Sequence, residues 1–182
     1  MVDKYSIRRS ILGKRGRLTK ARIETLSKII CQKVLSLDKV MDKEHFSLYL
    51  AINKEVDTKM IINELFKLNK NINVACYKRG KTYFFAKFTN WQNLEKGPYG
   101  IFQPKNPSNV AGALVDVAII PGVAFSKSGV RLGYGKGVFD KLLSKTKTFK
   151  IGLAYEFQIV DKIPQEQHDL VMDLVVTEEN IY

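Results

Sequence analysis

The sequence is poor in cysteine and histidine and contains no long apolar run. Its two cysteines, Cys31 and Cys76, are far apart and lack the spacing of metal ligands, which favours a protein of a reducing compartment. The longest apolar run, residues 117–125, is interrupted by Pro121 and Gly122 and is far too short to cross a bilayer. No apolar segment of the secretory type follows Met1. We therefore expect a cytoplasmic protein with no membrane association.

Acidic residues are few relative to basic ones. The 182 residues include 18 Asp and Glu against 30 Lys and Arg, which gives a formal net charge of +12. Such an excess favours anionic partners such as nucleotides, polyanionic metabolites or nucleic acid. Because the charge is spread along the chain rather than gathered in one tail, a basic nucleic-acid arm is the weaker interpretation.

The hydrophobic pattern predicts one α/β domain over residues 1–182, since no repeat, low-complexity segment or domain boundary interrupts it. Helical spacing predicts helices at residues 2–15, 20–37, 59–68 and 138–144. Strand-like runs occur at residues 46–52, 71–77, 82–88, 115–120, 149–154 and 174–177, and residues 90–109 are loop-rich. Because residues 71–88 resemble a hairpin, we expect a mostly parallel, mixed sheet with helices on both faces, a three-layer αβα arrangement.

Residues 121–140, PGVAFSKSGVRLGYGKGVFD, are the stretch on which the function depends. They follow a strand pattern and precede a helix pattern, so a glycine-rich loop between strand and helix is predicted. Glycines that allow positive φ, together with basic side chains, form sites for anions, and phosphate is the anion expected. The glycines are Gly129, Gly133, Gly135 and Gly137, and the basic residues are Lys127, Arg131 and Lys136. The alternative is a turn whose basic residues face solvent.

This loop matches neither of the two best-known phosphate-binding motifs. A Walker A loop requires glycine where Val130 stands and Ser or Thr where Gly137 stands. The dinucleotide-binding spacing requires its third glycine at the position of Val138. If phosphate binds here, it binds to a loop of another kind.

Charged residues elsewhere are candidate ligands. Lys4 and Arg8 lie one turn apart on the first predicted helix, where a shared anion would relieve their repulsion; a solvated basic face is the alternative. Glu55 follows a predicted strand, where open α/β sheets bind ligands, although most such carboxylates are ordinary loop residues. Asp169 and Asp173 precede the last strand, and one of them could serve Mg²⁺, which takes few protein carboxylates.

Taken in order, these segments resemble the 5-formyltetrahydrofolate cyclo-ligase family, also called 5,10-methenyltetrahydrofolate synthetases. The strongest similarity is RLGYGKG at residues 131–137, followed by an aromatic residue and an aspartate. Lys4 and Arg8 match the family's opening Lys-x-x-x-Arg pattern. Further matches are EVDT at residues 55–58, GIFQP at 100–104 and the closing segment at 168–178. The similarity covers essentially the whole chain.

The resemblance implies a ring closure that depends on ATP and Mg²⁺. ATP would phosphorylate the formyl oxygen of 5-formyltetrahydrofolate, and N10 would then attack the activated carbon. The products would be 5,10-methenyltetrahydrofolate, ADP and phosphate. Such a phosphoryl transfer mainly requires positioning and charge neutralisation. We expect a monomer that binds no nucleic acid, and the positive charge suits a polyglutamate tail on the folate.

The resemblance also implies roles for individual residues. Arg131 and Lys136 would be catalytic, because they neutralise charge that develops during transfer. Leu50, Glu55 and Phe102 would bind the folate, and Asp140 and Asp173 would hold Mg²⁺. ATP would contact Lys4, Tyr5, Ser6, Ile7, Arg8, Arg131, Leu132, Gly133, Tyr134, Gly135, Lys136, Gly137, Val138 and Phe139.

Three positions depart from the family pattern. Val138 stands where an aromatic residue is usual, Ser126 where aspartate is frequent and Gln103 where glutamate is commoner. A folate-binding relative without turnover is therefore one alternative. A basic nucleic-acid-binding module is another, because aromatic and basic residues that alternate can bind single strands. Its residues would be Tyr83, Phe84, Phe85, Trp91, Lys78, Arg79, Lys81 and Lys87.

Overall fold

Strand β6, Val117–Pro121, lies in the middle of a six-stranded sheet with the order β11-β9-β6-β1-β2-β3. This computed structural model describes residues 3–77, 83–97, 100–110, 115–144, 146–166 and 169–182. Neighbouring strands pair in parallel throughout, except that β3 pairs antiparallel with β2. The mostly parallel, mixed sheet predicted from the sequence is therefore confirmed. The other strands are β1 (His45–Leu48), β2 (Asn71–Tyr77), β3 (Tyr83–Lys87), β9 (Phe149–Leu153) and β11 (Leu174–Val176).

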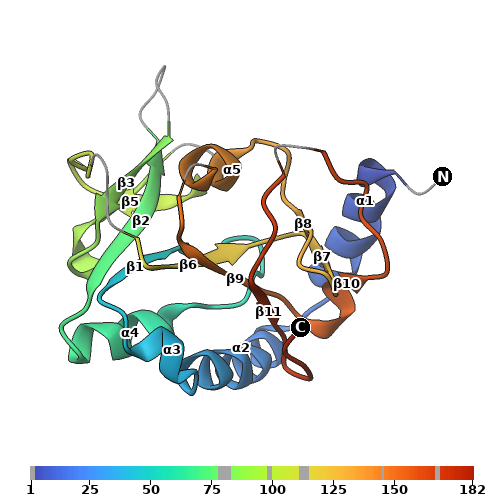
Figure 1. Ribbon diagram of the computed structural model, residues 1–182, viewed down its shortest axis with the longest axis horizontal. Helices are drawn as coiled ribbons and strands as arrows, with labels where there is room; N and C mark the ends of the chain where they lie inside the picture. The colour runs from blue at the N-terminus through green and yellow to red at the C-terminus, as the bar shows by residue number, and fades with distance from the viewer. Residues whose placement is uncertain (1–2, 78–82, 98–99, 111–114, 145, 167–168) are drawn as a thin grey trace.

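Helices cover both faces of this sheet (Figure 1). One face carries α2 (Lys20–Leu35), α3 (Asp38–Met41) and α4 (Lys59–Lys67), and the other carries α5 (Val138–Leu143). The Thr19 hydroxyl accepts a hydrogen bond from Arg22 N at 3.2 Å and so caps the N-terminus of α2. No helix in the described part of the chain is long and apolar enough to span a bilayer.

A second, three-stranded sheet corrects the prediction that residues 121–140 are one loop. It consists of β7 (Ala124–Ser126), β8 (Arg131–Leu132) and β10 (Ile159–Val160), in the order β10-β7-β8. Helix α1, Lys4–Gly16, packs Ile7 and Ile11 into the same apolar cluster as Val123, Ala124 and Leu132. These strands are too short to be recognised from the periodicity of the sequence. The glycine-rich loop is limited to residues 133–137, between β8 and α5.

Two further boundaries differ from the predictions. The strand expected at residues 46–52 ends at Leu48, because a turn occupies residues 52–55. The stretch at residues 90–109 contains the 3-10 helix η1 (Trp91–Asn93) and an antiparallel pair, β4 (Leu94–Lys96) and β5 (Phe102–Pro104). Another 3-10 helix, η3 (Glu156–Gln158), follows β9.

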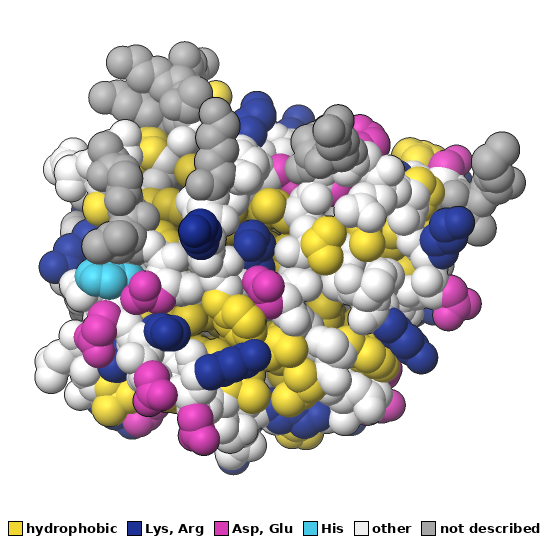
Figure 2. Space-filling view, viewed as in Figure 1, with side chains coloured by type: hydrophobic (Ala, Val, Ile, Leu, Met, Phe, Trp, Pro, Cys, Tyr) yellow, Lys and Arg dark blue, Asp and Glu magenta, His cyan; other side chains and the backbone are white. Residues whose placement is uncertain are grey.

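The surface view shows how the excess positive charge is arranged. Lys and Arg side chains are scattered over the face in Figure 2, among acidic and apolar side chains, and do not form one patch. This pattern agrees with the even distribution of basic residues along the sequence.

Phe125 joins the small sheet to the large one. Its ring is enclosed by Gly122 and Gly152, and a Cβ atom added at either glycine would lie 2.5 Å from ring atoms. Such contacts are far inside van der Waals distance, so both glycines are required by the close approach of the ring. The Phe125 ring therefore fills the space that side chains at positions 122 and 152 would occupy, and the two sheets pack against each other through this ring.

We predict that Gly152→Ala lowers the free energy of unfolding by on the order of 1–3 kcal/mol, because the new methyl group overpacks the ring. Urea unfolding measures the effect. Gly13→Ala is the matched control: nothing lies within 4 Å of its added Cβ, and it is in the middle of α1. That change should stabilise by up to about 1 kcal/mol. Equal changes in the free energy of unfolding for Gly152→Ala and Gly13→Ala would contradict the conclusion that the Phe125 ring requires glycine at position 152.

Candidate active site

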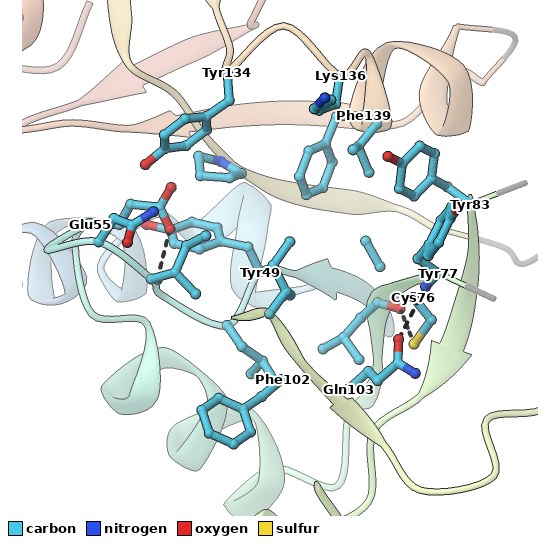
Figure 3. A pocket seen from close by; sticks show the side chains of 18 of the residues that line it. Tyr49, Glu55, Cys76, Tyr77, Tyr83, Phe102, Gln103, Tyr134, Lys136 and Phe139 are labelled. Carbon is cyan, nitrogen blue, oxygen red and sulfur yellow. Dashed lines mark hydrogen bonds between the residues drawn. The ribbon is translucent and has the colours of Figure 1, made fainter. Parts of the chain in front are cut away.

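The carboxyl ends of three parallel strands open into a pocket of about 350 Å³ (Figure 3). Tyr49 and Leu50 follow β1, Tyr77 ends β2 and Pro121 ends β6, and all four line the pocket. This is the edge at which open α/β sheets bind ligands, as expected for Glu55. The volume lies in the range of small-molecule sites.

Eight of the seventeen residues predicted to bind substrates meet in this pocket. The three residues assigned to the folate, Leu50, Glu55 and Phe102, line it. Glu55 is only 5% exposed, whereas Phe102 is 47% exposed and lies at the rim. Five residues assigned to ATP or catalysis also line it, namely Arg131, Tyr134, Lys136, Val138 and Phe139. The structure thus joins Leu50 and Glu55 to residues that lie 76 or more positions further along the chain.

Helix α1 reaches the same region through Arg8. Its Nε donates to the carbonyl oxygen of Gly133 at 2.8 Å, which places the helix beside the segment 133–137. Lys4 instead forms ion pairs of 2.8 Å with both Glu166 and Asp169. Of the other residues assigned to ATP, Tyr5 is 71% exposed, and Ser6 N donates to Asp3 Oδ1 at the N-cap. Ile7 is a core residue, so only its backbone is available to a ligand.

The segment 133–137 has the backbone freedom that the sequence suggests, with one correction. Gly135 and Gly137 have φ values of 93° and 63°, and Gly129 has 83°. Gly133 does not have positive φ, and the prediction for it was wrong on this point. It is needed for space instead, because an added Cβ would lie 2.7 Å from Arg131 Nη1. The neighbouring Leu132 side chain is buried in the cluster with Ile7.

The two aspartates proposed for Mg²⁺ have different surroundings. Asp140 Oδ2 pairs with Arg131 Nη2 at 2.6 Å, and its Oδ1 accepts from Leu170 N at 3.3 Å. Asp173 Oδ2 accepts from Lys150 N at 2.7 Å, at the start of β9. No cluster of three or more metal-ligating side chains occurs among the described residues. Mg²⁺ carried by a nucleotide needs only one or two carboxylates, and Asp140, next to the pocket residue Phe139, fits that requirement.

A strained turn presents Glu55 to the pocket. Asn53 and Lys54 both have positive φ, 49° and 61°, although neither is glycine. Glu55 N donates to Ile52 O at 2.9 Å, and the Glu55 carboxylate accepts from Ile52 N at 3.0 Å. Lys54 Nζ donates to the carbonyl oxygens of Gly16 and Leu18, at 2.6 and 2.8 Å. Strain of this kind persists where surrounding contacts enforce it, and it is concentrated at functional sites.

Burial changes the acidity of Glu55. Desolvation raises the pKa of its carboxyl to about 7, although the Ile52 N–H group, the charge of Arg15 and the Tyr134 hydroxyl lower it. At neutral pH this carboxyl is therefore poised between its charged and neutral forms. It can become ionised when a ligand supplies N–H donors.

Sequence reasoning missed Arg15, which lies behind this pocket. Its side chain is 1% exposed, and it donates to the Tyr134 hydroxyl through Nη2 and to Gly122 O through Nη1 at 3.3 Å. The sequence did contain a sign of its burial. Arg15 follows Ile7 and Ile11 at i+4 spacing, and this spacing places it on the buried side of α1. Other pocket residues that were not predicted are Tyr49, Asn53, Cys76, Tyr77, Tyr83 and Gln103.

The departures from the family pattern have local explanations. Ser126 Oγ accepts from Val130 N at 3.0 Å and so closes the turn between β7 and β8. Gln103 Oε1 accepts from Tyr77 N at 3.2 Å, and its amide donates to Glu95 at 3.4 Å, which an ionised glutamate could not do. Val138 lines the pocket at the start of α5.

Comparison with known proteins identifies the family. The sequence model of the 5-formyltetrahydrofolate cyclo-ligase family matches residues 1–178. The chain belongs to the 5-formyltetrahydrofolate cyclo-ligase family. The resemblance seen in the sequence motifs is therefore confirmed.

Individual relatives agree with this assignment. The chain is 31% identical to a 5-formyltetrahydrofolate cyclo-ligase of Haemophilus influenzae, with 95% of this chain and 97% of that one covered. It is 32% identical to one of Mycoplasma genitalium, at 97% and 98% coverage. The solved structure of Aquifex aeolicus 5,10-methenyltetrahydrofolate synthetase superposes with a TM-score of 0.86 at 32% identity, covering 98% of this chain and 91% of that one.

We predict that Glu55→Gln changes how stability depends on pH. The wild-type carboxyl holds its proton in the folded state up to about pH 7, whereas in the unfolded state it loses the proton near the usual value of 4.5. Between these values the unfolded state binds fewer protons, so wild-type stability falls as pH rises, by on the order of 3 kcal/mol in total. The variant lacks this decrease.

Urea unfolding at a series of pH values from 4.5 to 8 measures the difference between the two proteins. The difference should change across this window and level off above it. Parallel stability curves would show that Glu55 is not held in its neutral form by burial.

Proposed function

We propose that this protein converts 5-formyltetrahydrofolate to 5,10-methenyltetrahydrofolate, with ATP converted to ADP and phosphate. The observation that supports this most is the single pocket in which the residues assigned to the folate meet those of the segment 131–139. The named relatives are cyclo-ligases or methenyltetrahydrofolate synthetases over nearly the whole chain. A phosphoryl transfer from ATP to the formyl oxygen requires both substrates side by side, and this pocket offers such an arrangement.

The folate occupies the apolar part of the pocket in this proposal. Glu55 accepts hydrogen bonds from the N–H groups of the pterin ring, and the side chains of Leu50, Val138 and Phe139 form apolar walls. Phe102 contacts the folate at the rim. Exclusion of water from the ring strengthens the electrostatic interactions within the site.

The ATP phosphates lie between α1 and the segment 133–137. Arg8, Arg131 and Lys136 supply positive charge there, and the positive-φ glycines allow backbone N–H groups to approach the phosphates. Arg131 and Lys136 neutralise the charge that develops on the transferred group. Asp140 would hold Mg²⁺, which supplies further charge neutralisation at the phosphates. The assignment of Asp173 to the metal remains a prediction.

Carboxylates neutralise two of the proposed phosphate ligands in the unliganded protein. Arg131 is paired with Asp140, and Lys4 is paired with Glu166 and Asp169. Phosphate oxygens can take the place of these carboxylates as hydrogen-bond acceptors, so each cation keeps a negatively charged partner when phosphate binds.

The nucleic-acid alternative has less support. Phe85 is buried, and Phe84 and Trp91 pack against the main core, so these rings are not displayed for stacking with bases. Trp91 also donates to Asn63 Oδ1 at 2.9 Å. Lys78, Arg79 and Lys81 lie outside the described residues. Binding of single-stranded nucleic acid that weakens steeply with salt would favour this alternative over the enzyme.

The decisive experiment mixes the protein with Mg·ATP and 5-formyltetrahydrofolate and follows the absorbance of the methenyl product. A rise that requires all three components is expected. Binding of the folate without such a rise would indicate a folate-binding relative without turnover. Absence of both would contradict the proposed function.

We further propose that the protein is a cytoplasmic monomer and accepts polyglutamylated folate.

We predict that Lys136→Ala lowers turnover by about 10²–10³-fold, the usual cost of removing one group that stabilises transition-state charge. Its exposed side chain implies a change in stability within about 0.5 kcal/mol. Lys141→Ala, at an exposed position on α5, is the matched control and should leave turnover unchanged. Equal losses of turnover and stability in the Lys136 variant would indicate a structural role.

We predict that Asp140→Asn raises the Mg²⁺ concentration needed for half-maximal turnover by about 10–100-fold. Loss of the ion pair with Arg131 should also reduce stability, so the comparison is made below the unfolding temperature of the variant. Asp173→Asn is the informative companion, because it leaves that ion pair intact. An unchanged Mg²⁺ requirement in either variant removes that aspartate from the metal site.

A further inference from the structure

Arg15 is a buried cation without a carboxylate partner. Within the described residues it forms no ion pair, unlike Arg131, which is paired with Asp140. Its Nε is buried and has no hydrogen-bond partner. A buried charge that is incompletely paired is costly, because its hydration is lost without full compensation. Packing alone does not explain such a residue, since an apolar side chain of similar length would fill the position without this cost.

The Tyr134 hydroxyl connects Arg15 to the pocket. Arg15 Nη2 donates to this oxygen, and the guanidinium carbon lies 5.4 Å from the centre of the tyrosine ring. Figure 3 shows the hydroxyl directed towards Glu55, and this hydroxyl lowers the pKa of the carboxyl. An arginine, a tyrosine and a carboxylate thus form a chain from the interior to the pocket surface.

We infer that Arg15 is a positioning residue for the folate, which places positive charge behind Glu55 and acts through Tyr134 to orient the Glu55 carboxylate towards the pterin ring. The inference rests on the proposed function, since it assigns Glu55 to the folate. Ile52 N donates to one oxygen of Glu55, and the remaining lone pairs of the carboxylate are available to a ligand. Nothing in the family motifs noted in the sequence includes Arg15.

Arg15 is the cation whose charge lowers the pKa of this carboxyl, and two further cations, Arg131 and Lys136, line the same pocket. Desolvation raises the pKa of Glu55, and Arg15 and Tyr134 oppose that effect. Two other phenols lie nearby: Tyr49, whose pKa is raised well above its usual value by burial and by Glu55, and Tyr155, whose hydroxyl donates to Glu55 O at 3.1 Å. Neither carries charge near neutral pH. Removal of the Arg15 charge should therefore favour the neutral carboxyl, which binds the pterin N–H groups poorly.

The test is the pH dependence of kcat/KM for 5-formyltetrahydrofolate, which reports ionisation in the free protein. Wild type should lose activity as pH falls through the ionisation of Glu55. In Arg15→Met this acid limb should move to higher pH by about one unit or more, the usual effect of losing an opposite charge at short range. Activity should recover towards the wild-type level at pH values above the shifted limb.

Further variants separate charge from packing. Arg15→Lys keeps the charge and should keep the limb near its wild-type position. Tyr134→Phe removes the connecting hydroxyl and should move the limb in the same direction as Arg15→Met. Glu55→Gln should abolish the limb. Arg17→Met removes the same charge from an exposed position at the end of α1 and should leave the profile unchanged.

If Arg15→Met lowers kcat/KM by the same factor at every pH and the acid limb does not move, the inference is overturned in favour of a structural role. A limb that persists in Glu55→Gln, or moves equally in Arg17→Met, would overturn it too. If Arg15→Met does not fold, as judged by circular dichroism, the Tyr134→Phe profile decides, and an unmoved limb there rejects the inference. Absence of turnover in wild type would instead contradict the proposed function, so the two failures are distinguishable.

Discussion

The parallel pairing of the central strands is the constraint on which the site depends. Because β1, β2 and β6 run in the same direction, their carboxyl ends meet at one edge, and Leu50, Tyr77 and Pro121 are brought together there. Helix α5 follows the small sheet and completes the pocket with Val138 and Phe139. No single segment contains the site, and its residues become neighbours only when the sheet has formed.

Electrostatic compensation is the second organising feature. The protein has a formal charge of +12, yet two cations near the site are neutralised locally, Arg131 by Asp140 and Lys4 by Glu166 and Asp169. Arg15 and Glu55 do not form a direct ion pair and interact across a tyrosine hydroxyl. A site arranged in this way keeps charge available for anionic substrates without a large cost to folding.

Much of this arrangement was predictable because it depends on local patterns. Helical spacing located α2, and apolar β-type runs located the strands of the large sheet. The small sheet was missed, because β8 has two residues and its pairing with β7 is a tertiary interaction that leaves no periodicity. Arg15 was missed because a basic residue is usually exposed, and only its i+4 repeat with Ile7 and Ile11 indicated burial.

The contact between Lys54 and the end of α1 has a mechanical consequence. One ammonium group binds the carbonyl oxygens of Gly16 and Leu18, and the same residue forms the left-handed turn that carries Glu55. The helix that bears Lys4 and Arg8 and the turn that bears the pocket carboxylate therefore share an anchor. Sliding α1 along its axis would lengthen both hydrogen bonds of this ammonium group, so the position of the helix and that of the turn are coupled through Lys54.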